Sequence, residues 1–135
     1  MADYGAGAAR ASQAYRMTAD AGLSPADAAI ALHERLCREL FAAKLAYEQK
    51  ALDRMCLHTT RCTHVLLELR SGVKVEGGDD GARALEQLYL HLFWGVARVL
   101  RAKEPAKRLQ YIIDILWKLS REMRTFQINR QKSIS

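Results

Sequence analysis

One stretch, from Leu52 to Leu69, constrains the fold more than any other part of the sequence. Within it, apolar and small side chains recur at alternating intervals of three and four residues, and the positions between them are mostly charged or polar. This spacing predicts an amphipathic helix with one buried seam. A single helix cannot cover its own seam, so other long segments must pack against it, and the chain predicts a helical bundle. The seam residues are Leu52, Met55, Thr59, Cys62, Leu66 and Leu69.

Three further segments carry the same helical period. The first spans residues 25–48 and begins at Ser24-Pro25, where a serine can cap free backbone N–H groups and a proline fits the first helical position. A turn near Gln49-Lys50 separates it from the seam helix. Residues 71–81 contain four glycines and form a loop. The remaining helices span residues 82–103 and 106–126. We therefore expect an all-α, antiparallel four-helix bundle.

The length of 135 residues suits one domain. We divide the chain into a mobile N-terminal arm (residues 1–14), the helical bundle (15–127) and a basic C-terminal tail (128–135). No apolar run approaches the roughly 20 residues that a membrane span needs, and the first residues lack the order of a secretory signal. The three cysteines form no C-x-x-C pair, which argues against a disulfide framework. These features predict a cytoplasmic protein without membrane insertion.

Catalytic and metal sites are poorly supported by the sequence. His33 and Cys37, like His58 and Cys62, are four residues apart, so each pair shares a helix face and the two pairs could form a zinc site. A hairpin turning near residue 49 would, however, place the two histidines toward opposite ends. The chain lacks the Glu-x-x-His motif of dinuclear bundle enzymes, and no feature marks a nucleophile with an oxyanion pocket. We expect no catalysis, no metal and no cofactor.

Nucleic-acid binding is the alternative function that the charge supports. The net charge is +6, and basic residues cluster around the turn between the third and fourth helices. Such a cluster could follow a phosphate backbone. Acidic residues interrupt it, and no helix-turn-helix is visible, so this reading ranks second. The cluster consists of Arg98, Arg101, Lys103, Lys107 and Arg108.

The third and fourth helices have more apolar surface than one seam requires. Aromatic and branched side chains widen the apolar arc on both helices. They could line a groove for an apolar helix, or they could complete the core or a dimer interface. An aromatic residue in the loose N-terminal arm, Tyr15, could cover such a groove. The groove residues that we predict are Tyr89, Phe93, Ile113, Leu116 and Trp117.

Several short motifs occur in an order that resembles the FliS family of flagellar secretion chaperones. The match spans residues 15–120 and includes an N-terminal tyrosine, a Ser-Pro helix start and a glycine-containing loop before a Leu-x-x-Leu-Tyr helix. The chain differs from the family where His33 replaces a tyrosine before an acidic residue. The residues concerned are Tyr15, Ser24, Pro25, Leu32, His33, Glu34, residues 75–78, Leu85, Leu88 and Tyr89.

The resemblance implies a four-helix bundle that acts as a chaperone rather than an enzyme. Such chaperones bind the C-terminal segment of flagellin in the cytoplasm, where that segment is disordered by itself. Capping the segment prevents premature polymerisation and supports type III export. The flagellar export gate is a candidate further partner, and both a monomer and a homodimer are compatible with the sequence. A disordered ligand of this kind can wrap a large apolar surface at the cost of its ordering entropy.

Overall fold

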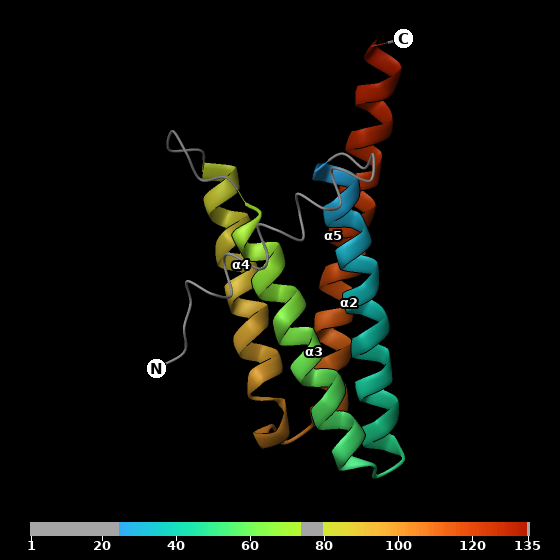
Figure 1. Ribbon diagram of the computed structural model, residues 1–135, viewed down its shortest axis with the longest axis vertical. Coiled ribbons are helices and arrows are strands. Elements are labelled where there is room, and N and C mark those ends of the chain that lie inside the picture. The colour runs from blue at the N-terminus through green and yellow to red at the C-terminus, as the bar shows by residue number, and fades with distance from the viewer. Residues whose placement is uncertain (1–24, 74–79, 135) are drawn as a thin grey trace.

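A computed structural model describes residues 25–73 and 80–134 of the protein, with side chains for residues 27–73 and 80–125. Its elements are α2 (Pro25–Glu48), α3 (Leu52–Ser71), α4 (Asp80–Ala97), the 3₁₀ helix η2 (Val99–Arg101) and α5 (Pro105–Ile134). The described residues contain no strand. Figure 1 shows the four α-helices running alternately up and down. The predicted all-α helical bundle is therefore confirmed.

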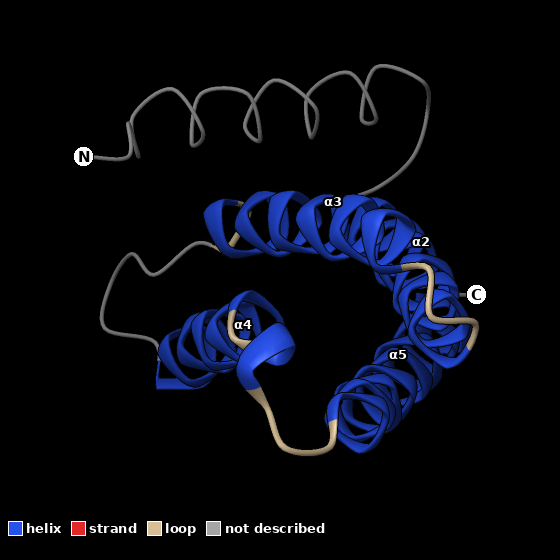
Figure 2. Ribbon diagram, turned by 90° about the horizontal axis from the view of Figure 1, so that it is seen from below, coloured by secondary structure: helices blue, strands red, loops and turns tan. Residues whose placement is uncertain are grey.

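The helices form an open arc in the order α4, α3, α2, α5. Helix α2 packs against α3 on one side and α5 on the other, while α4 packs mainly against α3. Seen end-on in Figure 2, α4 and α5 are the two ends of this arc. They approach closely at Gly95, where a methyl group in place of the glycine hydrogen would lie 3.3 Å from Cδ1 of Ile112. Because Gly95 has no side chain, the backbone of α4 can lie this close to Ile112 of α5.

The core runs along the inner faces of all four α-helices. The predicted seam of α3 is largely confirmed, with Val65 as an additional member. Leu52, however, is 56% exposed, because it lies at the first position of its helix, beyond the end of the core. The large side chains that are essentially fully buried include Leu36, Leu40, Met55, Leu66, Leu69, Tyr89, Leu92, Leu109, Ile112, Ile113 and Leu116.

The turn between α2 and α3 lies at the predicted position. Lys50 has a φ of 59°, in the left-handed region. The N–H of Lys50 donates to the carbonyl of Tyr47 at 3.0 Å, and the N–H of Ala51 donates to that of Ala46 at 2.8 Å. These two bonds define a Schellman motif, which usually has glycine at the left-handed position. Lys50 occupies that position without the conformational freedom of glycine.

Two helix ends differ from the sequence prediction. Helix α4 ends at Ala97 instead of residue 103, and a 3₁₀ turn follows it. Gly95, Val96 and Val99 are weak helix formers, which favours an early end. Helix α5 continues to Ile134 instead of ending near residue 126. Its sequence after Pro105 contains neither glycine nor proline, so residues 128–134 extend the helix. The predicted arm (residues 1–14) lies outside the described residues.

Candidate functional site

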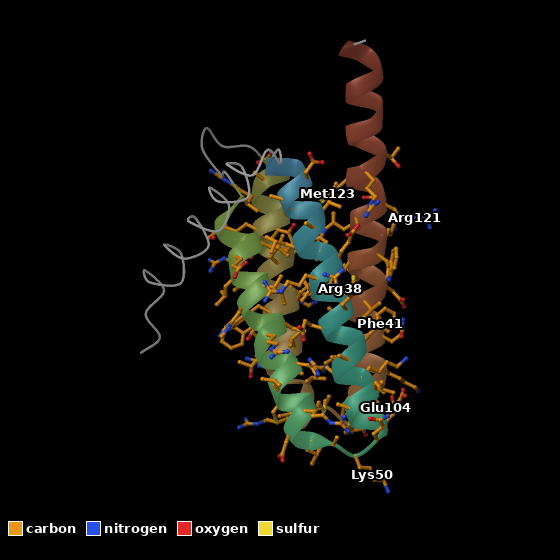
Figure 3. The ribbon with its side chains drawn as sticks, turned by 45° about the vertical axis from the view of Figure 1, so that its right-hand side comes forward. Arg38, Phe41, Lys50, Glu104, Arg121 and Met123 are labelled. Carbon is orange, nitrogen blue, oxygen red and sulfur yellow. The ribbon has the colours of Figure 1, made fainter. Side chains whose placement is uncertain are left out.

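Within the described part of the chain, a groove between α2 and α5 offers an apolar surface that is suited to hold a partner. It has a volume of about 400 Å³ and is lined from both helices. Phe41 of α2 and Trp117 of α5 line it and remain 46% and 54% exposed. Figure 3 shows Phe41 and Arg38 on α2 beside α5, which carries Arg121. We call this surface the α2–α5 groove. Its full lining is Glu34, Cys37, Arg38, Phe41, Trp117, Ser120, Arg121 and Arg124.

The rim of the α2–α5 groove is basic. Three arginines and one glutamate line it. Arg124 forms an ion pair with Glu34 across the two helices. Farther along the same helix pair, Lys44 Nζ donates a hydrogen bond to Gln110 Oε1 at 2.9 Å. These cross-helix contacts tie α2 to α5, while Arg38 and Arg121 leave positive charge beside an apolar surface.

A buried polar cluster lies beneath the groove. The Nε2 atom of His33 is 2.7 Å from the hydroxyl of Tyr89, and its Nδ1 atom is 3.2 Å from Oγ of Ser120. The three residues belong to α2, α4 and α5, so one imidazole joins three helices. Burial lowers the pKa of His33 from 6.5 to about 4. The ring is therefore neutral at physiological pH, with one nitrogen as donor and the other as acceptor.

The histidines and the cysteine that could bind a metal or act as a nucleophile, His33, His58 and Cys37, are in environments that do not favour either role. Both His33 nitrogens are engaged in hydrogen bonds, and His58 Nδ1 lies 2.6 Å from a carboxylate oxygen of Glu39. Burial raises the pKa of the Cys37 thiol to about 11, although Arg38 acts in the opposite direction. Cys37 is therefore a protonated thiol at neutral pH. Across the described part of the chain, no group of three potential ligand residues could hold a metal ion.

The five predicted groove residues do not form one surface. Tyr89, Ile113 and Leu116 are core residues, each no more than 1% exposed. Phe93 is half-buried on α4 and makes an edge contact with Trp94, whereas Trp117 lies in the α2–α5 groove. A role of the buried three in binding a partner would require the bundle to open, and it stays a prediction. Tyr15, the predicted groove-covering residue, lies outside the described residues.

Two residues that line the α2–α5 groove, Arg38 and Phe41, were not predicted from the sequence. Phe41 lies in the apolar part of α2, yet its side chain is exposed. The spacing of apolar residues on α2 indicates that Phe41 is exposed. The residues spaced three and four apart on this helix include Leu36, Leu40 and Ala43, which are all fully buried. Phe41 follows Leu40 directly, so it points about 100° away from that stripe.

Comparison with known proteins agrees with this helical architecture. A sequence model of the family described as "Flagellar protein FliS" matches residues 8–124. No curated protein and no solved structure gives a significant match. Among the helices that the structure describes, none is long and apolar enough to cross a membrane. The match covers most of the chain. The protein therefore belongs to the FliS family of flagellar proteins.

Proposed function

We propose that this protein is a flagellar export chaperone that binds the disordered C-terminal segment of flagellin in the cytoplasm, with the α2–α5 groove as a docking surface. Binding prevents premature polymerisation of the subunit and keeps it competent for type III export. The observation that carries the proposal is the pair of half-exposed aromatic rings, Phe41 and Trp117, in one groove. Family membership supports the flagellar role.

The chemistry of the groove supports a helical, apolar ligand. Large aromatic side chains bury much area with little loss of side-chain entropy, and they dominate many peptide-binding grooves. An amphipathic segment that folds on binding would place its apolar face between the two rings. Arg38 and Arg121 could then pair with acidic residues at the edges of that segment. The bundle itself stays folded, so only the ligand is ordered on binding.

Calorimetric titration with a peptide of roughly the last 40 residues of the flagellin from the same organism tests the proposal, since coupled folding has a distinct heat signature. We expect one-to-one binding with a large negative heat-capacity change and only a modest dependence on salt, because ion pairs at the exposed Arg38 and Arg121 contribute little. The double variant Phe41→Ala/Trp117→Ala should bind at least about tenfold more weakly. Leu57→Ala is the matched control, because Leu57 is similarly exposed but lies on α3, outside the groove.

Two results would overturn the proposal. The absence of binding to the wild-type protein would remove the flagellin function. Binding that is equally strong in the double variant and in Leu57→Ala would keep flagellin as a ligand but move its site away from the α2–α5 groove.

A further inference from the structure

A second hollow lies between α4 and α5, at the end of the bundle where η2 connects them. Its volume is about 620 Å³, and it shares no lining residue with the α2–α5 groove. Leu92, Gly95 and Ile112 contribute apolar surface to it, and the exposed ring of Tyr111 forms part of its wall. We call this feature the α4–α5 hollow. Its size falls in the range of about 300–1,000 Å³ that is common for ligand sites.

The rim of the α4–α5 hollow is strongly basic. Lys103, Lys107 and Arg108 line it, together with one acidic residue, Glu104. Glu104 pairs with Lys107 at 3.0 Å. Neither Lys103 nor Arg108 forms an ion pair with any residue that the structure describes. The rim therefore carries two cations that form no ion pair with a described carboxylate.

We propose that the α4–α5 hollow is a second binding site, which takes a short acidic peptide segment of a partner protein. Carboxylates of the segment would pair with Lys103 and Arg108, while an apolar side chain would rest on Leu92 and Ile112. Charge complementarity identifies the class of partner. The site is distinct from the proposed flagellin groove, so the chaperone could hold flagellin and a second protein together.

The shape of the hollow favours a peptide over nucleic acid. A phosphate backbone is bound by a run of exposed cations along a surface. Here Glu104 interrupts that run, and the space between the cations is an apolar concavity. An extended or helical peptide offers both parts that the site needs, which are carboxylates and an apolar side chain.

Selection from short random peptides displayed on phage, against the full-length protein, tests the inference without assuming a partner. Selected peptides should be enriched in Asp and Glu. Their binding to Lys103→Glu/Arg108→Glu should fall by at least about tenfold. The matched control is Arg35→Glu/Arg83→Glu, which makes the same change in charge at two exposed positions outside the hollow. Binding to the control should stay within about twofold of wild type.

Several outcomes would overturn the inference. Peptides without acidic enrichment, or acidic peptides that bind both double variants equally, would show that the α4–α5 hollow is not their site. A DNA duplex is titrated in parallel. If charge reversal at Lys103 and Arg108 weakens DNA binding while no acidic peptide is selected, the hollow is a nucleic-acid surface instead.

The flagellin titration separates this inference from the proposed function. Lys103→Glu/Arg108→Glu should bind the flagellin peptide as wild type does, because neither residue lines the α2–α5 groove. Loss of acidic-peptide binding with retained flagellin binding supports two sites. Retained acidic-peptide selection with no flagellin binding would reject the proposed function alone.

Discussion

His33 makes the stability of this bundle depend on pH. An ordinary histidine has a pKa of 6.5, and burial lowers that of His33 to about 4. The unfolded chain therefore binds a proton more readily than the folded chain between these two pH values. Stability is complete above pH 6.5 and falls as the pH drops toward 4, by about 3 kcal/mol for the full shift. Urea unfolding from pH 7 to pH 4 should show this loss.

The control for this pH dependence is His33→Gln, which cannot titrate in the same range. This variant starts less stable at pH 7, because glutamine does not reproduce both hydrogen bonds that the imidazole makes with Tyr89 and Ser120. Its free energy of unfolding should fall less steeply with pH than that of the wild type. Parallel curves for the two proteins would show that other groups cause the acid sensitivity.

Truncation of two adjacent residues on α5 should cost very different amounts of stability. Leu116 is fully buried, whereas Trp117 is 54% exposed in the α2–α5 groove. Leu116→Ala leaves a cavity and should cost about 2–5 kcal/mol of stability. Trp117→Ala should cost less than about 1 kcal/mol, because its ring is already largely hydrated. Urea unfolding of both variants measures the difference, and similar costs would place Trp117 in the core.

At the level of the elements, the turn between α2 and α3 can be improved by one substitution. Lys50 adopts a φ of 59° in a Schellman motif, a conformation that glycine adopts without the Cβ clash. Lys50→Gly should raise the free energy of unfolding by about 0.5–1 kcal/mol, measured by thermal unfolding. Lys50→Ala retains the Cβ atom and should give no such gain. An equal gain from both variants would mean that removal of the lysine charge is responsible.

The four helices could be predicted from sequence because apolar residues that recur every three or four positions are the ones that a helix buries against its neighbours. Met55, Thr59, Cys62, Leu66 and Leu69 are all buried, as their spacing predicts. The ends of the helices were harder to predict. Helix α4 ends at Ala97 because of small differences in helix propensity, which the hydrophobic pattern does not show. The spacing separates Phe41 from the buried stripe of α2. It does not predict the α2–α5 groove itself, because periodicity shows which face of a helix is apolar but not how far apart two neighbouring helices lie.

At the scale of the whole molecule, the open arc explains why two candidate sites coexist. A closed bundle would bury both flanks of α5 against neighbours. Among the described residues, α5 packs extensively on α2 and makes far fewer contacts with α4, one of them at Gly95. One flank of α5 therefore lines the α2–α5 groove and another lines the α4–α5 hollow. The two sites differ in character, since two exposed aromatic rings, Phe41 and Trp117, line the first, whereas Tyr111 is the exposed aromatic ring of the second.

Binding at the α2–α5 groove should stabilise the whole bundle. A ligand that binds only the folded state raises the free energy of unfolding by about 2.7 kcal/mol at a concentration 100 times its Kd. The flagellin peptide should therefore raise the Tm of the wild-type protein. The rise in Tm should be smaller for Phe41→Ala/Trp117→Ala at the same peptide concentration. The larger Kd of this variant lowers the stabilisation that a given peptide concentration provides. A scrambled peptide of identical composition controls for nonspecific effects, and an equal rise in Tm with that peptide would argue against a defined site.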